Sequence, residues 1–482
     1  MGALTLLDWR AKLDTGDLTS TSLTRDALSR IKELEPRLNA ITQTDQDLTL
    51  AAAAAADARI HRGERGPLLG IPIVVKDNIN LAGLSLSQGS RISGNTTSTY
   101  NATVIQRLLE AGAVPLAKAN MDEFAMGSSG EYSAFGPTRN PWDLSRVPGG
   151  SSSGAVVSVS AGYASFALGT DTGGSVRLPA GFCGVSALRP TYGVLSRYGV
   201  TAMASSLDQV GPVAISAKDL AAGLSVMSGR DPHDSTSLDL PGSQRLASLR
   251  AAPLKGLKIG LPKEYFGEGL SPAVRSVLET ALGRLASEGA ELVEVSLPHT
   301  RFAIDTYYLI NTSEVSSNLS RFDGVRFGTR KTSENLFGMI SGTRDEGFGL
   351  EVKRRILLGA FCLSRGYYEA FYLKALKVRT LITRDFQEAF KKVDFIATPL
   401  SPSTAFRIGS KTTNPLEMYL ADVFTVTMAL AALPALAVPA GLAEGLPVGL
   451  QLVGPTLTDV KLLEVGAAFQ ELTNHHLLQP AL

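Results

Sequence analysis

Short apolar runs that alternate with helical segments constrain this fold more than any other feature of the sequence. Ile71–Val75 is a short β-branched run, and a helical stretch at 101–111 precedes the apolar run Ala113–Ala117. The alternation returns where the apolar run Leu257–Leu261 is followed by a helical stretch at 271–288. Strands that alternate with helices favour crossover connections and parallel pairing. We therefore expect an α/β fold whose large, mixed, mostly parallel core sheet is flanked by helices.

Two regions of the chain are predicted to be mainly helical. In residues 5–60, leucine, isoleucine and alanine recur near helical spacing. Residues 302–392 are polar, basic and helical in pattern, and apolar strand-like runs return from Phe395. We expect residues 1–482 to form a single domain, with N-terminal helices over about 1–65 and a helical insertion over about 300–392.

The location of the chain follows from three features. Val423–Ala440 is apolar but is interrupted by two threonines and two prolines, which predicts a buried helix followed by a buried strand. Residues 1–14 lack the charged-then-apolar layout of a secretory signal. Cys183 and Cys362 lie far apart and form neither a disulfide framework nor a zinc pattern. We expect a cytoplasmic protein that does not enter a membrane.

The charge balance bears on nucleic-acid binding. The chain has 46 lysine and arginine residues against 45 aspartate and glutamate residues, a formal net charge of +1. Such a chain has no global electrostatic reason to bind RNA strongly. If RNA is involved, another chain is expected to hold most of it.

A long segment rich in glycine, serine and proline is a candidate functional loop. It spans residues 127–154 and leads into the helix-like stretch Ala155–Ala167 and a second glycine cluster, Gly169–Ser175. Long loops without periodicity are usually functional or disordered. Because packed elements bracket this one, we favour the functional interpretation.

A serine in these loops would need a base to become a nucleophile. Histidine is the usual base, but none of the five histidines lies between residues 62 and 232, and the G-x-S-x-G motif is absent around these serines. Lys76 directly follows the apolar run Ile71–Val75, where burial would lower the pKa of its amine. A lysine at a strand end can equally be a solvated residue without a chemical role.

The glycine cluster also has two interpretations. Thr172, Gly173 and Gly174 precede Ser175, so their backbone N–H groups could stabilise an oxyanion beside a nucleophile. The phosphate-binding motif G-x-x-x-x-G-K-[ST] is absent, which argues against a nucleotide loop. The remaining alternative is a tight turn without chemistry.

Three motifs resemble those of the amidase-signature family, and the resemblance to that family extends over nearly the whole chain. They are Gly70–Asn78 (GIPIVVKDN), Pro148–Gly154 (PGGSSSG) and Gly169–Ala180 (GTDTGGSVRLPA). The resemblance implies the amidase-signature fold and a Ser-Ser-Lys triad. It assigns Ser175 as the nucleophile, Lys76 as the base and Ser151, in a cis peptide, as the bridge between them. It assigns the oxyanion donors to Thr172, Gly173 and Gly174.

Within the family, further stretches are most similar to the ammonia-donating A subunits of bacterial aminoacyl-tRNA amidotransferases. These stretches are Asn120–Gly127, Phe135–Trp142, Phe182–Gly184, Ser205–Pro212, Glu351–Ile356 and Met418–Asp422. The resemblance implies hydrolysis of the side-chain amide of glutamine, which is a zwitterion. It implies that Arg355 binds the α-carboxylate and Asp422 the α-ammonium. From the residues alone, Arg355 could be part of a solvated helix face and Asp422 a helix cap.

The other pocket residues implied by the resemblance are less specific. Gly127, Ser128 and Ser129 would line the pocket, and Tyr307 would lie near the amide, with Tyr308 as the alternative. The sequence departs from the family loop at two positions, where Ser153 replaces a glycine and Ala155 replaces a serine. These departures affect the expected loop conformation but not the triad.

The resemblance also implies partners. Ammonia would pass to a tRNA-binding, kinase-like B subunit that holds ATP and Mg²⁺ and amidates Glu-tRNA(Gln), Asp-tRNA(Asn) or both, and a small C subunit would complete a heterotrimer. No cofactor or metal is expected in this chain. The alternatives are a free-standing amidase of small aliphatic or aryl amides and a scaffold subunit without catalysis. A membrane-bound lipid amidase is disfavoured because no N-terminal span is present.

Overall fold

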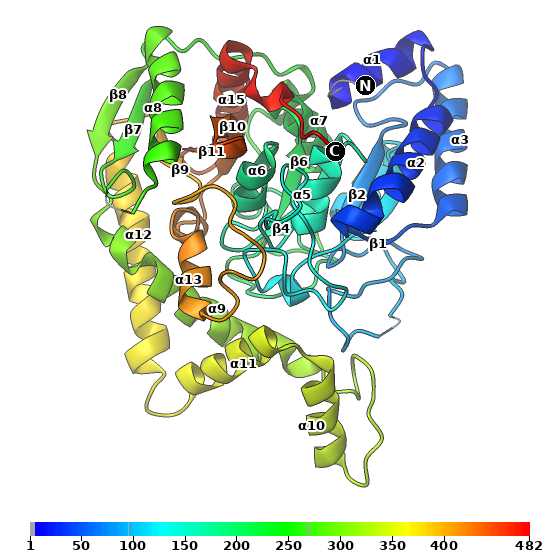
Figure 1. Ribbon diagram of the computed structural model, residues 1–482, viewed down its shortest axis with the longest axis vertical. Helices are drawn as coiled ribbons and strands as arrows, with labels where there is room; N and C mark the ends of the chain where they lie inside the picture. Colours follow the sequence, from blue (N-terminus) through cyan, green and yellow to red (C-terminus); the bar gives the residue numbers. More distant parts are fainter. Residues whose placement is uncertain (1–4, 95, 268) are drawn as a thin grey trace.

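An eleven-stranded mixed β-sheet runs through the computed structural model, which describes residues 5–94, 96–267 and 269–482 (Figure 1). Residues 1–4, the start of the N-terminal segment considered above, lie outside the described part. The strand order is β1-β3-β2-β4-β6-β5-β10-β11-β9-β7-β8. The strands are β1 (Ile41–Gln43), β2 (Pro72–Lys76), β3 (Val114–Ala119), β4 (Phe166–Asp171), β5 (Ser186–Arg189), β6 (Gln209–Ala214), β7 (Lys258–Pro262), β8 (Glu291–Val295), β9 (Phe395–Pro399), β10 (Ala435–Ala443) and β11 (Leu446–Val453).

Parallel pairing is less extensive than the sequence predicts. Of the ten strand pairs in the described chain, β2–β3, β2–β4, β7–β8 and β7–β9 are parallel, and the other six are antiparallel. The parallel pairs occupy the two ends of the sheet, where helices connect the strands. In the middle, β10 and β11 form a hairpin, which must be antiparallel. The predicted mixed sheet is therefore confirmed, with its parallel part confined to the ends.

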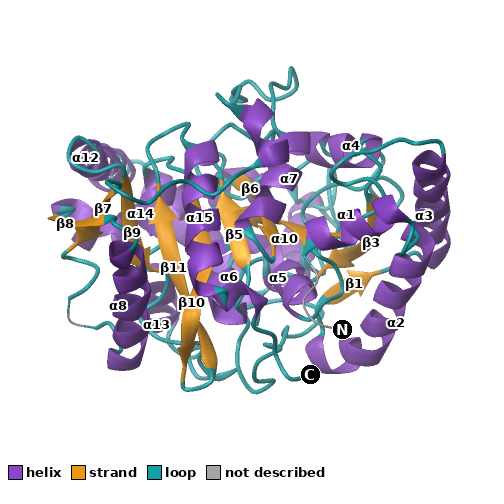
Figure 2. Cartoon of the chain, turned by 90° about the horizontal axis from the view of Figure 1, so that it is seen from above, coloured by secondary structure: helices purple, strands orange, loops and turns teal. Residues whose placement is uncertain are grey.

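Helices lie on both faces of this sheet (Figure 2). They are α1 (Leu6–Thr15), α2 (Ser20–Leu38), α3 (Gln46–His61), α4 (Thr103–Glu110), α5 (Ser153–Ser160), α6 (Arg177–Cys183), α7 (Ala217–Met227), α8 (Pro272–Ser287), α9 (Ala303–Asn318), α10 (Leu336–Gly347), α11 (Leu350–Leu363), α12 (Lys374–Ala389), α13 (Pro415–Tyr419), α14 (Val426–Leu430) and α15 (Asp459–Thr473). The predicted N-terminal helices correspond to α1, α2 and α3. The short edge strand β1 lies between α2 and α3, and its three residues are too few to show a strand pattern.

The predicted helical segment between β8 and β9 is confirmed by α9 to α12. In Figure 1, α10 projects farthest from the sheet, whereas α9 packs against α11, α12 and α14. α11 packs along α9, where Gly359 permits close approach because a Cβ there would meet the backbone of Thr312. The segment therefore carries residues of α9 and α11 toward the central part of the chain.

Two apolar stretches show how far the hydrophobic pattern of the sequence predicts secondary structure. The stretch Val423–Ala440 contains a buried helix, α14, followed by the buried strand β10, as predicted. Among the described residues, no helix combines the length and the apolar character needed to cross a membrane. The helix predicted over Ala155–Ala167 ends at Ser160, because Gly162 adopts φ +73° and the chain then enters β4. The helix α5 and the strand β4 are both buried and apolar, so the hydrophobic pattern does not show where the helix ends and the strand begins.

The glycine-rich loop is ordered and largely buried. Between the 3-10 turn Glu123–Ala125 and α5, the chain forms turns rather than helices or strands. The Asp122 carboxylate accepts hydrogen bonds from the backbone N–H groups of Gly130 (3.0 Å) and Tyr132 (2.9 Å). Side-chain acceptors of this kind satisfy the buried backbone that a loop would otherwise leave unpaired. These bonds hold the loop against the segment that follows β3.

Candidate active site

Lys76 ends β2 and is fully buried. Its amine lies 2.7 Å from the Ser151 hydroxyl, 2.9 Å from the Ser152 hydroxyl and 2.9 Å from the Thr170 hydroxyl. The loop before α5 supplies the two serines, and β4, the neighbour of β2, supplies Thr170. The amine is thus surrounded by neutral oxygens rather than by carboxylates.

Burial sets the charge of this amine. Removal from water lowers the pKa of Lys76 to about 7, whereas the carboxylates of Asp122, Asp171 and Asp208 act in the opposite direction without reversing the shift. A lysine with such a pKa is substantially neutral near pH 7 and can accept a proton. The sequence prediction of a desolvated lysine is consistent with this environment.

Ser151 follows a cis peptide bond from Gly150, as the family resemblance implied. The Gly150 N–H donates to the Ser128 carbonyl at 2.9 Å, and the Ser151 carbonyl accepts from Asp122 N–H at 3.2 Å. A Cβ on Gly150 would collide with the Asp122 carboxylate, so the loop needs glycine there. These contacts aim Ser151 at Lys76.

Ser175 lies in the turn between β4 and α6 and is 8% exposed. Its carbonyl accepts from the Ser152 N–H at 3.1 Å, which joins this turn to the loop that carries Ser151. Within the described chain, the Ser175 hydroxyl has no hydrogen-bond partner. The structure therefore brings Lys76 and Ser151 into direct contact and holds Ser175 beside them through the backbone.

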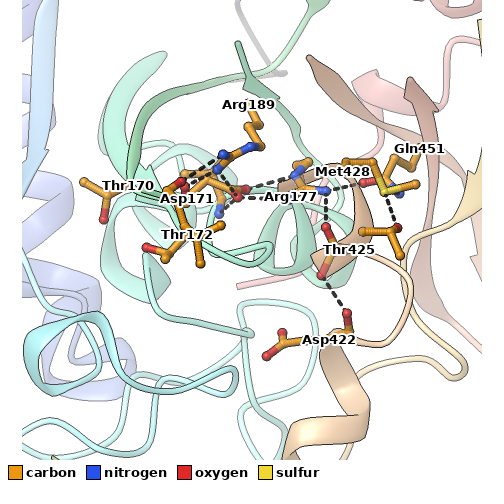
Figure 3. Close-up of polar contacts among 12 residues, drawn as sticks. Thr170, Asp171, Thr172, Arg177, Arg189, Asp422, Thr425, Met428 and Gln451 are labelled. Atoms are coloured by element: carbon orange, nitrogen blue, oxygen red, sulfur yellow. Dashed lines mark hydrogen bonds and ion pairs between the residues drawn. The ribbon is translucent and has the colours of Figure 1, made fainter. Parts of the chain in front are cut away.

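A buried ion-pair network supports the Ser175 turn (Figure 3). Asp171 pairs with Arg177 through two contacts of 2.9 Å and with Arg189 at 3.1 Å, and all three side chains are buried. Burial alone would raise the pKa of Asp171, but the two guanidinium groups outweigh it and lower that pKa to about 2. Asp171 and Arg177 flank the turn in sequence, so their pairing closes it.

The network continues to the opposite side of the site. Arg177 donates to the Gln451 side chain at 2.5 Å and to the Thr425 carbonyl at 3.1 Å. The Gln451 amide donates in turn to Thr398 and to the Phe424 carbonyl. Figure 3 shows this line of contacts from Arg189 to Gln451, with Asp422 just beyond Thr425. It fixes the Ser175 turn relative to the segment that carries Asp422.

The candidate oxyanion turn has unused backbone donors. Within the described residues, the N–H groups of Gly173 and Gly174 donate to no acceptor. Gly174 has φ +151°, and a Cβ at Gly173 would lie 2.7 Å from the Tyr307 hydroxyl. The Thr172 hydroxyl donates to Asp208 at 2.7 Å, which anchors the start of the turn. This geometry favours the oxyanion interpretation over a tight turn without chemistry.

One end of the candidate pocket carries Asp422. Its carboxyl accepts from the Ser128 hydroxyl at 2.5 Å. Burial raises the pKa of Asp422 to about 7, although the Ser128 hydrogen bond and the charge of Arg355 oppose the shift. An arriving ammonium would favour the ionised form. Ser129 is fully buried and its hydroxyl lacks a partner among the described residues, whereas Gly127 leaves room for the Asp122 carboxylate.

The other end carries Arg355, which is 3% exposed and therefore not part of a solvated helix face. Its Nε donates to Glu351 at 2.8 Å and its Nη1 to Asn311 at 3.3 Å. The guanidinium carbon lies 5.1 Å from the Tyr308 ring centroid and 5.5 Å from that of Tyr419. Arg355 is thus held rigidly beside the site.

Both tyrosines named as alternatives lie at the site, in different places. Tyr307 packs against Gly173 of the oxyanion turn. Tyr308 stacks on Tyr419 beneath Arg355, and its hydroxyl lies 3.5 Å from the Asp422 carboxylate. Tyr307 therefore lies against the candidate oxyanion turn, and Tyr308 lies between Arg355 and Asp422.

The two departures from the family loop fit their surroundings. The Ser153 hydroxyl donates to the Thr138 hydroxyl at 3.1 Å, so the extra side chain is hydrogen-bonded. Ala155 is fully buried inside α5. Neither position touches the Lys76 amine.

Several residues of the site had not been predicted. Asp171, Arg177, Asp122 and Asn311 contact or position the candidate groups, but their roles depend on burial. The signal available was that Asp171 and Arg177 are charged residues inside a glycine-rich, apolar segment. Charges in such a segment are unusual unless they are paired.

The chain matches the family model described as Amidase over residues 22–463. It is 52% identical over 480 residues to the A subunit of glutamyl-tRNA(Gln) amidotransferase from Chloroflexus aggregans, and the match covers 99% of this chain and 98% of that protein. It is 51% identical over 471 residues to the protein of the same name from Moorella thermoacetica, with 98% and 96% coverage.

Solved structures of amidases are also similar to this chain. The A subunit of glutamyl-tRNA(Gln) amidotransferase from Thermotoga maritima superposes with a TM-score of 0.78 at 40% identity, covering 94% of this chain and 91% of that one. A peptide amidase from Stenotrophomonas maltophilia superposes with a TM-score of 0.82 at 32% identity, covering 98% and 97%. The shared fold thus includes enzymes that act on different amides.

Proposed function

The chain belongs to the amidase family, and from this premise we propose that it is the glutamine-hydrolysing component of a tRNA-dependent amidotransferase. The relatives named as A subunits of glutamyl-tRNA(Gln) amidotransferase match it over almost their entire length. The mechanism and the substrate rest on the residues of the candidate site.

The observation that carries the substrate assignment is a pair of side chains of opposite charge, Arg355 and Asp422, that both lie beside Tyr308. Tyr308 lies beneath the Arg355 guanidinium, and its hydroxyl lies 3.5 Å from Asp422. A simple amide carries no charged group that could pair with Arg355 or Asp422. A free amino acid carries a carboxylate and an ammonium, which match both residues. Glutamine meets this requirement and carries a side-chain amide.

The proposed reaction begins at the neutral Lys76 amine. Lys76 withdraws a proton from Ser151, which in turn takes the proton of Ser175 as the Ser175 oxygen attacks the amide carbon. The negative charge that develops on the carbonyl oxygen is stabilised by the backbone N–H groups of the 172–174 turn. The amide nitrogen takes up the proton that Lys76 accepted and departs as ammonia, and water then hydrolyses the glutamyl ester on Ser175.

The fate of the ammonia involves partners. We propose that it passes to a kinase-like B subunit that binds tRNA, ATP and Mg²⁺, with a small C subunit completing a heterotrimer. Glu-tRNA(Gln) is the acceptor that the names of the relatives favour. The proposal places the chain in the cytoplasm, and its two cysteines are free and buried.

A second candidate is a free-standing amidase, since the Stenotrophomonas structure is a peptide amidase of the same fold. The two functions share the triad and differ in the pocket. A peptide amidase must accept a substrate whose amino end is extended by further residues, whereas the buried Asp422 favours a free ammonium.

The test is ammonia release from glutamine by the purified chain, alone and with its B and C subunits and misacylated tRNA. Release that increases with the partners and disappears in Ser175→Ala is expected. Turnover of propionamide or benzamide by the chain alone, without glutaminase activity under any condition, would support the free-standing amidase instead.

A further inference from the structure

Asn311 contacts Arg355 from the interior of α9. It lies four residues beyond Tyr307 and three beyond Tyr308, so the three side chains share one helical face toward the site. Its side-chain oxygen, Oδ1, accepts a hydrogen bond from Arg355 Nη1 at 3.3 Å. Glu351 occupies Nε at 2.8 Å, and among the described residues Nη2 has no acceptor.

These contacts leave the guanidinium one free edge. Tyr308 and Tyr419 contact its face, Glu351 and Asn311 take two of its nitrogens, and Nη2 remains for a ligand. A guanidinium binds a carboxylate through a planar edge, so its plane must be fixed before the substrate arrives. Asn311 is uncharged, unlike Glu351, and it therefore orients Arg355 without cancelling its charge.

The burial of Asn311 argues that it is not present for stability. It is fully buried, and its Nδ2 has no partner among the described residues. A buried, unsatisfied amide donor destabilises the fold, and asparagine is a poorer helix former than leucine. A leucine of similar size would serve a structural role better.

We propose that Asn311 is a positioning residue that orients Arg355 to bind the α-carboxylate, and so selects amides of α-amino acids. This inference rests on the proposed glutaminase function. It assigns recognition of the carboxylate to the facing helices α9 and α11, whereas Asp422, which follows α13, recognises the ammonium.

The test compares Asn311→Leu with Asn318→Leu in the complete complex. Asn318 is the matched control, because it lies on the same helix but bonds to Met203 and Ser205, away from Arg355. Three amides are used: glutamine, glutaramate, which lacks the ammonium, and 4-aminobutanamide, which lacks the carboxylate. Where an analogue is not turned over, its inhibition constant against glutamine replaces KM.

Asn311→Leu is expected to raise KM for glutamine and glutaramate about tenfold, which corresponds to the loss of one oriented charge-assisted contact. KM for 4-aminobutanamide, kcat and the melting temperature should remain near wild type. Asn318→Leu should lower the melting temperature without separating the three amides.

Three outcomes would overturn the inference. Equal changes for all three amides, or a clear fall in melting temperature for Asn311→Leu, would show a structural role. No change for any amide would show that Arg355 needs no such support. Absence of glutaminase activity in the wild-type complex is a different result, since it removes the proposed function itself.

Discussion

The Lys76 amine and the Ser151 hydroxyl are 2.7 Å apart, and both side chains are fully buried. No carboxylate of the described chain contacts the amine directly, and the carboxylates of Asp122, Asp171 and Asp208 offset the effect of burial only in part. Burial lowers the pKa of Lys76 to about 7. Under the proposed mechanism, this contact lets Lys76 accept the Ser151 proton near neutral pH.

This pKa predicts the pH dependence of catalysis at saturating glutamine. Below pH 7, Lys76 is protonated and cannot accept a proton, so kcat should rise with pH and level off above about 7. Ammonia release measured from pH 5.5 to 9 tests this, and Lys76→Ala should lose at least about 10³-fold in kcat. A profile that stays flat across this range would remove Lys76 as the base.

Asp422 predicts a separate pH effect, on KM rather than kcat. Burial raises the pKa of Asp422 to about 7, so its carboxyl is protonated below that pH and cannot pair with an ammonium. KM for glutamine should rise as pH falls below 7, approaching about tenfold per pH unit. In Asp422→Asn, KM should be high and independent of pH between 5.5 and 7. If wild-type KM stays constant over that range, Asp422 does not bind the ammonium.

The buried network around Asp171 predicts a large effect on stability. Asp171→Asn would leave the guanidinium groups of Arg177 and Arg189 buried without a carboxylate, which should destabilise the fold by about 3–5 kcal/mol. Urea unfolding measures this. Glu471→Gln is the matched control, because its pair with Lys218 is exposed and should contribute less than about 1 kcal/mol. Similar effects for both variants would mean that the network does not hold the turn.

The candidate catalytic residues could be predicted from the sequence more readily than the residues that position them. Lys76 and Ser175 are marked by local patterns, an apolar strand before the lysine and glycines before the serine. Asn311 has no such mark, because its partner Arg355 is 44 residues away, and the contact of Arg177 with Gln451 spans 274 residues. Separation along the chain also explains why sheet direction was predicted only in part. The antiparallel middle depends on a hairpin at residues 435–453 that pairs with β5, far upstream in the sequence.

Adjacent side chains posed a different difficulty. Tyr307 and Tyr308 point about 100° apart on a helix, so a sequence pattern suggests that only one of them faces the site. Both do, because Tyr307 packs on Gly173 whereas Tyr308 lies between Arg355 and Asp422. This part of α9 therefore lies between the candidate oxyanion turn on one side and Arg355 and Asp422 on the other.

That insertion makes Gly173 sensitive to the smallest substitution. In Gly173→Ala, the added Cβ would lie 2.7 Å from the ring carbon and the hydroxyl of Tyr307, which real structures do not tolerate. Tyr307 is buried against Tyr308 and cannot move away easily, so the turn itself should shift. The Gly173 N–H would then miss the developing oxyanion.

Gly173→Ala should therefore lower kcat by about 10²–10³-fold with little change in KM for glutamine, because the oxyanion forms only in the transition state. Gly283→Ala is the control: it lies in α8 with open space at its Cβ, so activity should be unchanged and stability should rise by up to about 1 kcal/mol. Steady-state kinetics and thermal unfolding of both variants separate the two effects. A Gly173→Ala variant with wild-type kcat would show that the 172–174 turn does not bind the oxyanion, and the donors would then have to be sought elsewhere around Ser175.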